Sequence, residues 1–323
     1  MSNLVRCIDP SGQLTCMAAD TTAMVREARR IHQTSNVCTA ALGRLLTAAS
    51  FMGITLKGAD HSVTLRMAGD GPAGSVIAVS DAKGNTRGYV MNPDVRVPNK
   101  SERKLDVGGA VGHNGTLSVI KDLGLKDPYV GQVPLVSGEV AEDVTGYYAI
   151  SEQTPTVLSL GVLCTPDTEE VIVAGGFIIQ LLPTATEETI TKVEEGLKGL
   201  PAVTTMLTDG LTPLEILQKA LPNFELEVLE EADTGYECNC SRARVEKALI
   251  SLGPEELLDM AKDETTEVGC QFCDKKYHFT SEELRKLSKK VVDIGCQMLY
   301  SIKRRRNRER TTAEFRRPNF LGV

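Results

Sequence analysis

Four cysteines in the C-terminal third of the chain are spaced as two close pairs. Cys238 and Cys240 are separated by one residue, and Cys270 and Cys273, which follow after 29 residues, are separated by two. In a reducing compartment, clustered cysteines indicate metal or redox chemistry before structural disulfides, and four thiolates suit a tetrahedral Zn²⁺ site with no open position. We therefore predict that Cys238, Cys240, Cys270 and Cys273 bind one Zn²⁺ per chain.

The residues around the second pair fit a zinc knuckle. Phe272, Tyr277 and Phe279 can cover the turn that Cys270-Gln-Phe-Cys273 forms. His278 is an alternative ligand, but four cysteines already fill the coordination shell, so we interpret it as an exposed or packing histidine. A thioredoxin-like role for this pair would need a βαβ context, which the segment lacks.

Signals for other kinds of chemistry are weak. Gly69-Asp-Gly-Pro-Ala-Gly74 matches the dinucleotide fingerprint, yet Pro72 interrupts it and residues 75–79 continue as a strand, so we predict a glycine turn. The chain has no Walker lysine, no Gly-x-Ser-x-Gly elbow and no His-Glu-x-x-His motif. We do not expect an enzyme.

Five further cysteines are scattered along the chain. We expect Cys7, Cys16, Cys38 and Cys164 to be small buried apolar residues, and Cys296 to be a thiol in a tail. The sequence assigns no role to any of them.

The amino-acid composition and the apolar runs argue against several classes of protein. Aromatic residues make up 4% of the 323 and there is no Trp, which argues against stacking surfaces for bases or sugars. The longest apolar run, residues 171–182, is too short to span a bilayer, and the N-terminus does not resemble a signal peptide. We expect a soluble, cytoplasmic protein without membrane contact.

The strand-rich N-terminal part, residues 1–183, is predicted to be an α+β core domain with packed antiparallel sheets and a few helices. An apolar helix is expected over residues 40–53, and a hairpin turns at residues 81–85. Further strands are predicted at residues 63–67, 115–120, 131–136, 146–151, 157–163 and 171–182.

Three shorter segments follow this core. Residues 184–235 are predicted to be an acidic helical linker, because residues 184–237 hold twelve acidic and three basic side chains and Thr212 to Glu215 form a capping box. Residues 236–290 are a small zinc-binding domain with thin apolar content, and such domains often need a metal. Residues 291–323 are a basic tail that we expect to be disordered, with eight Lys or Arg and two Glu at residues 303–317.

Up to about Lys290 the sequence resembles the 33 kDa chaperonin family. The resemblance is carried by Cys238-x-Cys240-Ser-Arg and Cys270-x-x-Cys273, and by the segments at residues 40–46, 104–110, 121–125 and 174–180. It implies an ATP-independent holdase chaperone of the cytosol that binds unfolding client proteins under oxidative stress. The basic tail and the five further cysteines depart from the family pattern.

The resemblance also implies a redox switch. The reduced, zinc-bound form would be inactive. Oxidation would form the disulfides Cys238–Cys240 and Cys270–Cys273, zinc would leave, and the linker and zinc domain would unfold to expose the client-binding surface. The active form is expected to be a homodimer.

Two alternative functions belong to other classes. A zinc-ribbon nucleic-acid-binding protein would use the cysteine knuckles and the basic tail, but the acidic linker speaks against it, so we do not expect nucleic acid as a partner. A thiol-disulfide oxidoreductase would instead use Cys270 and Cys273 catalytically.

Overall fold

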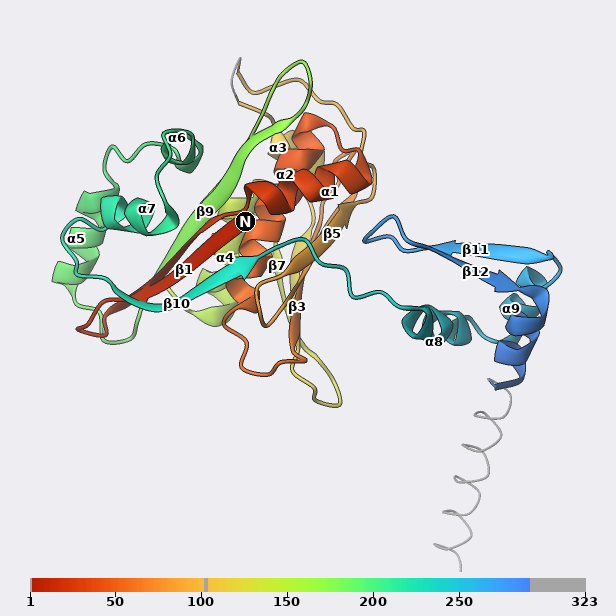
Figure 1. The fold of residues 1–323 in the computed structure, drawn as a ribbon. Coiled ribbons are helices and arrows are strands. Elements are labelled where there is room, and N and C mark those ends of the chain that lie inside the picture. The colour runs from red at the N-terminus through yellow and green to blue at the C-terminus, as the bar shows by residue number, and fades with distance from the viewer. Residues whose placement is uncertain (1, 102–103, 291–323) are drawn as a thin grey trace, which may run out of the picture. The chain divides into compact units, whose positions relative to one another are not determined.

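A computed structural model of the chain describes residues 2–101 and 104–290. The chain folds as two compact units, which divide between Cys238 and Asn239 (Figure 1). The predictions made for the basic tail and for Cys296 lie outside the described residues. Among the residues that are described, no helix is both long and apolar enough to cross a bilayer.

Two five-stranded antiparallel sheets form the first unit. The first sheet has the strand order β10-β1-β2-β9-β8, and the second has the order β5-β4-β3-β6-β7. The strands of the first sheet are β1 (Ser2–Ile8), β2 (Leu14–Asp20), β8 (Thr156–Cys164), β9 (Val171–Leu181) and β10 (Glu227–Thr234). Those of the second are β3 (Ser62–Ala68), β4 (Ser75–Asp81), β5 (Thr86–Val90), β6 (Thr116–Asp122) and β7 (Tyr129–Pro134).

The helix α2 (Asn36–Gly53) joins the two sheets into one core. It contacts strands of both sheets, and nearly all its side chains are buried, as its all-round apolar sequence predicts. The other helical segments of this core are α1 (Thr22–His32), α3 (Val107–Val111), α4 (Val140–Tyr147) and the π-helical turn η1 (Tyr148–Glu152). The predicted α+β class with packed antiparallel sheets is confirmed.

One predicted strand is wrong. Residues 146–151 lie in the end of α4 and in η1 rather than in a sheet. The aromatic and β-branched residues of this stretch favour a strand, but Val140 and Val144 are already buried at helical spacing before it, and the buried Tyr147 continues that spacing. The helix that begins at Val140 therefore determines the conformation of the residues that follow. By contrast, residues 69–74 form the predicted glycine turn, between β3 and β4.

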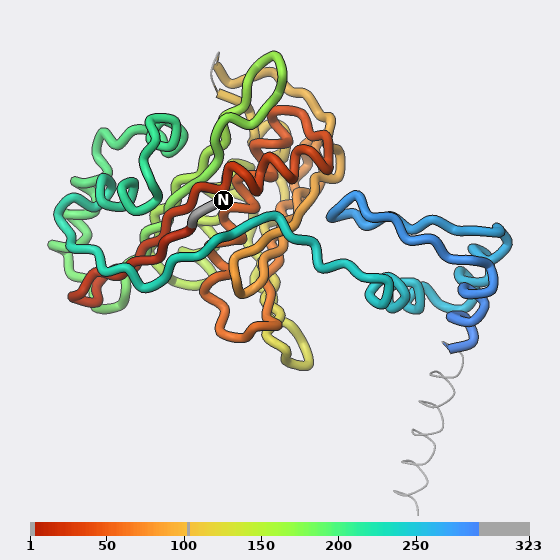
Figure 2. Tube along the Cα trace, in the orientation of Figure 1, coloured from red at the N-terminus to blue at the C-terminus, as the bar shows by residue number. Residues whose placement is uncertain are grey.

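The acidic segment after residue 183 is only partly helical. Its helices are α5 (Glu187–Leu197), α6 (Val203–Thr208) and α7 (Pro213–Ala220), and the predicted capping box of Thr212 and Glu215 is present at α7. Near its end the segment forms β10, which was not expected to be a strand. It pairs antiparallel with β1 at the edge of the first sheet, between residues that are 219 to 232 positions apart in sequence (Figure 2).

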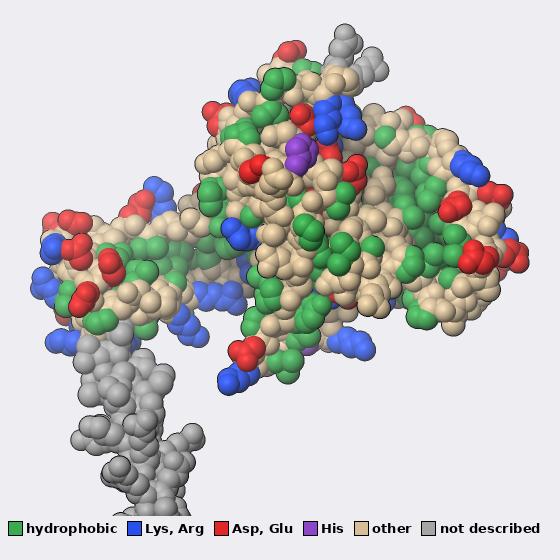
Figure 3. Space-filling view, turned by 180° about the vertical axis from the view of Figure 1, so that it is seen from behind, with side chains coloured by type: hydrophobic (Ala, Val, Ile, Leu, Met, Phe, Trp, Pro, Cys, Tyr) green, Lys and Arg blue, Asp and Glu red, His purple; other side chains and the backbone are tan. Residues whose placement is uncertain are grey.

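The helices α5, α6 and α7 cover one face of the first sheet. Their apolar side chains pack with those of β1, β2 and β9 in one buried cluster. Figure 3, seen from behind, shows apolar side chains where this helical lobe meets the rest of the first unit, with acidic side chains on the outer side of the lobe. The amphipathic helices therefore obtain their apolar partner from the sheet.

The second unit is small. It contains α8 (Arg242–Leu252), α9 (Pro254–Met260), the hairpin of β11 (Thr265–Gly269) and β12 (Lys276–Thr280), and a helical stretch over residues 281–290. Ser241 caps α8, and Pro254 opens α9. Among its residues up to 290, six buried apolar side chains form a core, namely Leu249, Leu257, Ala261, Phe279, Leu284 and Leu287.

Candidate metal centre

The four predicted ligands lie together. One Sγ atom from each of Cys238, Cys240, Cys270 and Cys273 falls within 4.8 Å of the others, and all four residues are half-buried. The Sγ atoms of Cys240 and Cys273 are 3.5 Å apart. The thiols of two segments that are separated by 29 residues in sequence thus lie next to one another.

Local backbone structure positions each pair. Cys270 and Cys273 lie in the turn between β11 and β12, where the Cys270 N–H donates to the Lys275 carbonyl over 3.0 Å and the Cys273 N–H to the Cys270 carbonyl over 3.3 Å. Cys238 and Cys240 lie in the extended stretch between β10 and the N-cap of α8. The hairpin therefore holds Cys270 and Cys273 in one turn. Cys240 directly precedes Ser241, so capping of α8 by Ser241 fixes the backbone next to the other pair.

The arrangement fits a zinc ion. Four sulfurs placed tetrahedrally at a Zn–S distance of about 2.3 Å would lie roughly 3.8 Å from one another. The 3.5 Å between Cys240 and Cys273 and the 4.8 Å limit for the set are close to that figure. Four thiolates also form the donor set of closed structural zinc sites, which leave no position for a substrate.

Polar side chains fix the surroundings of the thiols. The Tyr277 hydroxyl donates to Cys240 Sγ over 3.1 Å. Arg242 donates to the His278 carbonyl over 2.9 Å and to Glu283 over 2.7 Å, and its guanidinium lies 4.3 Å from the centre of the Phe279 ring. Arg242 thus joins the helix that follows the first cysteine pair to the strand that follows the second.

The expectations for the neighbouring aromatic residues are met in part. Tyr277 contacts Cys240, and Phe279 is fully buried in the small apolar core. His278 is exposed, and its Nε2 lies 3.8 Å from Glu267, in agreement with a histidine that is not a ligand. The contacts of Arg242 were missed, although Arg242 directly follows Ser241, which caps α8.

Among the scattered cysteines, the structure brings one pair together that the sequence did not indicate. Cys7, Cys16 and Cys38 are buried as expected, and Cys164 is half-buried. Cys7 and Cys16 lie directly opposite each other on β1 and β2. Only the register of this hairpin, which was not predicted, makes them neighbours.

Comparison with known proteins identifies relatives along most of the chain. The family model described as Hsp33 protein matches residues 2–280. The 33 kDa chaperonin of Clostridioides difficile (strain 630) is 48% identical over 289 residues, covering 89% of this chain and 99% of that protein. A second 33 kDa chaperonin, from Geobacillus sp. (strain WCH70), is 48% identical over 285 residues, covering 88% and 96%.

A solved structure is also similar. The crystal structure of the 33 kDa chaperonin, or heat shock protein 33 homolog, of Thermotoga maritima superposes with a TM-score of 0.81 at 37% identity. The match covers 90% of this chain and 99% of that one.

Proposed function

This chain belongs to the Hsp33 family of 33 kDa chaperonins, and from that premise we propose that it is a redox-regulated holdase. It would bind unfolding client proteins in the cytosol without ATP, remaining inactive while reduced and becoming active on oxidation. The grouping of the four cysteines carries this proposal, because it supplies a thiol-based switch, and three of the four belong to the unit with a small core.

The proposed ligands are Cys238, Cys240, Cys270 and Cys273, with one Zn²⁺ per chain. Bound zinc would act as a structural cross-link between four thiolates and would take no part in a reaction. The hydrogen bond from the Tyr277 hydroxyl stabilises the negative charge on Cys240 Sγ. Structural zinc contributes about 10–16 kcal/mol in small peptides, against about 5–15 kcal/mol for the stability of a whole domain.

Oxidation would remove all four thiolate ligands. In each pair two thiols lose two protons and two electrons to an oxidant such as peroxide, and one S–S bond forms. The proposed bonds, Cys238–Cys240 and Cys270–Cys273, close loops of a few residues only and leave the two halves of the site unconnected. Without thiolates the site cannot hold the metal, and the six-residue core is too small to hold the unit folded.

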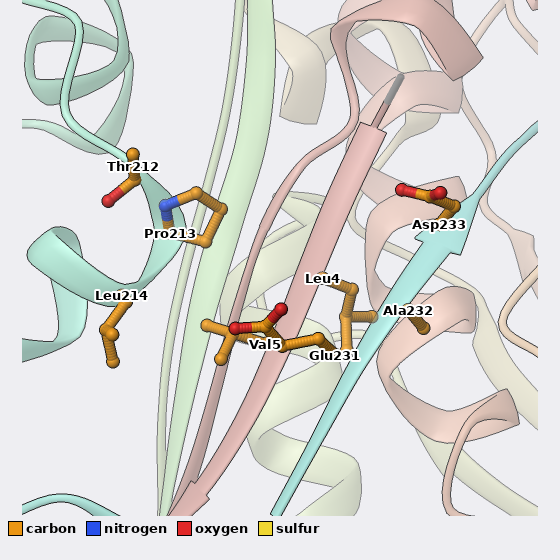
Figure 4. A pocket seen from close by; sticks show the side chains of 8 residues that line it. All are labelled: Leu4, Val5, Thr212, Pro213, Leu214, Glu231, Ala232 and Asp233. Atoms are coloured by element: carbon orange, nitrogen blue, oxygen red, sulfur yellow. The ribbon is translucent and has the colours of Figure 1, made fainter. Parts of the chain in front are cut away.

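The client-binding surface is proposed to lie on the first unit, beneath α5–α7. These helices cover the apolar face of the first sheet, and each is short enough to be marginal without that contact. At the start of α7, residues 212–214 face β1 and β10 across a cavity of about 440 Å³ (Figure 4). The first turn of α7 is therefore incompletely packed against β1 and β10.

We retain the functional division drawn from the sequence as part of this proposal. Residues 1–183 would be the chaperone core, residues 184–235 the releasable linker, and residues 236–290 the zinc-binding switch. Because β10 pairs with β1, release of the linker requires either that this pairing breaks or that α5–α7 detach while β10 stays. The exposed apolar face would also suit pairing of two oxidised chains, and we propose a homodimer as the active form.

Light scattering from a heat-unfolded client protein tests the proposal. The full chain would be compared in its reduced, zinc-loaded form and after peroxide treatment at raised temperature, with released zinc measured by a colorimetric chelator. We expect only the oxidised form to suppress scattering, with one zinc released per chain. Equal suppression by both forms, or none by either, would contradict the redox switch.

A further inference from the structure

Cys7 and Cys16 form a second thiol pair, outside the metal centre. They are direct partners in the antiparallel pairing of β1 and β2. Residues opposite each other in such a pair have Cα atoms about 4.5–5.5 Å apart, inside the range of about 4.4–6.8 Å that a disulfide spans. The backbone therefore places the two thiols where a bond can form without a large rearrangement.

Both thiols lie on the face of the sheet that the helices cover. Val5, Cys7, Leu14, Cys16 and Ala18 alternate onto this face and pack in one apolar cluster. The helices contribute Val193, Val203, Met206, Leu207, Ile216, Leu217, Ala220 and Leu221 to the same cluster. The exposed fractions of Cys7 and Cys16 are 0% and 1%, so a dissolved oxidant cannot reach either sulfur while the helices are docked.

We propose that Cys7 and Cys16 are a second redox couple, which α5–α7 keep sealed and which forms a disulfide after these helices leave the sheet. The inference rests on the proposed function for the event that removes the helices, but the sealing itself depends only on the packing in the first unit. The new disulfide would cross-link β1 to β2 on the surface that the helices have left. It would preserve the shape of that surface while its covering helices are absent.

The chemistry is a two-electron oxidation by a peroxide. The sulfur of Cys7 attacks hydrogen peroxide, the O–O bond breaks, and a sulfenic acid and one water result. The Cys16 thiol then attacks this sulfur, the S–S bond forms, and a second water leaves. Two thiols and one peroxide thus give one disulfide and two waters.

The mutual arrangement of the thiols supports this order. A hydrogen bond from the Cys16 thiol lowers the pKa of Cys7, although burial and the charge of Glu231 act in the opposite direction. The same hydrogen bond, together with burial, raises the pKa of Cys16. Cys7 is therefore the better nucleophile of the two, and Cys16 is suited to resolve the intermediate.

Peptide mass spectrometry can follow this pair without interference from the metal centre. No Lys or Arg lies between Arg6 and Arg26, so trypsin releases both cysteines in one peptide, residues 7–26. The disulfide form of that peptide lacks two hydrogens and takes no alkylating label. The reduced form takes two labels after unfolding.

Ile216→Asp separates release of the helices from oxidation of the zinc cysteines. Ile216 is fully buried in α7, and a carboxylate there opposes docking, whereas Gln218 on the same helix is exposed and Gln218→Asp is the matched control. In the reduced, zinc-loaded protein we expect labelling of Cys7 and Cys16 to be at least about tenfold faster in Ile216→Asp than in wild type or the control. Peroxide should then produce the disulfide peptide in Ile216→Asp at low temperature, and in wild type only on warming.

The results distinguish the two proposals. A disulfide peptide in Ile216→Asp supports the second couple even if wild type never releases zinc, in which case only the proposed switch has failed. The inference is overturned if Cys7 and Cys16 label quickly in Ile216→Asp yet stay reduced with peroxide, or if either joins another cysteine. It is equally overturned if Cys7 and Cys16 are labelled as fast in wild type as in Ile216→Asp, because the docked helices would then not protect the two thiols. If far-UV circular dichroism shows that Ile216→Asp is unfolded, the wild-type protein can be used instead. It would be warmed to intermediate temperatures, and hydrogen exchange of α7 would measure how far the helices have left the sheet. Labelling and oxidation of Cys7 and Cys16 would then be compared with that exchange.

Discussion

Several charged or chargeable side chains of the described residues are held partly away from water, and two groups of them lend themselves to a direct test. One is the set of four cysteines, whose Sγ atoms lie within 4.8 Å of one another. The other is Glu139, which precedes α4 and pairs with Arg44 over 2.7 Å and with Lys100 over 2.8 Å. Each of these groups is stabilised by named partners, so replacing one member should have a measurable and specific effect.

Replacing one ligand of the proposed zinc site should abolish metal binding. In Cys270→Ser a neutral hydroxyl replaces a thiolate, and we expect bound zinc to fall from one per chain to near zero in purified protein. Atomic emission or a colorimetric chelator measures this. Cys164→Ser, which alters a half-buried cysteine far from the cluster in sequence, is the control and should keep its zinc. Full zinc in both variants would refute the assignment of Cys270.

The Glu139 ion pairs should make stability depend on acid pH. Burial alone would raise the pKa of Glu139, but the hydrogen bond from Lys100 and the charges of Arg44 and Lys100 outweigh it and lower the pKa below its usual 4.5. A lowered folded-state pKa means that the carboxylate stabilises the fold above about pH 4.5 and that this contribution is lost as pH falls through the folded value.

Glu139→Gln should therefore destabilise the first unit by about 1–3 kcal/mol at neutral pH. The difference from wild type should shrink towards zero as pH falls below about 4, because the wild-type carboxyl is then protonated as well. Urea unfolding at several pH values measures it. A difference that stayed constant between pH 7 and pH 3 would show that the loss is one of packing and not of charge.

The three helices that follow the strand β9 depend on the first sheet for their stability. The helices α5, α6 and α7 are 11, 6 and 8 residues long, and their apolar sides lie against the first sheet. Helices of this length are marginal in water. They are therefore the elements of the first unit that should detach with the least cost.

Shortening one buried side chain of α7 tests this dependence. We expect Ile216→Ala to destabilise docking by about 2–4 kcal/mol, since it removes buried methyl groups and leaves a cavity, and Gln218→Ala to have little effect. Hydrogen exchange should speed up in α5–α7 of Ile216→Ala and remain slow in α2. Equal acceleration in α2 would mean that the helices and the central core unfold together.

The two units of the molecule differ in what holds them folded. The first has two five-stranded sheets around the buried α2, whereas six buried apolar residues form the core of the second. A core of that size does not normally suffice for independent stability without a metal or a cross-link. The two units should therefore respond differently to metal removal.

Chelation under reducing conditions is expected to unfold only the second unit. With zinc removed, amide protection should be lost over residues 242–280 and retained in α2 and in the second sheet. Hydrogen exchange with mass spectrometry gives both results in one experiment, and re-addition of zinc should restore the protection. Unchanged protection of residues 242–280 in the chelated protein would show that the six-residue core is sufficient.

Much of the site was predictable from sequence because its signals are local. The spacing within Cys238–Cys240 and Cys270–Cys273, the capping boxes and the all-round apolar pattern of α2 each depend on residues within a few positions of one another. Side-chain chemistry and helical period at that range are visible in one sequence. The four thiols then needed only a hairpin and a capped helix to bring them together.

Only the tertiary structure decided the features that join distant residues. Three such features are the pairing of β10 with β1, the register that sets Cys7 opposite Cys16, and the burial of Phe279 in the small apolar core. All three depend on contacts between separate segments. Residues 146–151 show the same limit, because a preceding helix overrode their strand propensity. Strand register is set by which apolar faces meet in the folded chain, and no single segment contains that information.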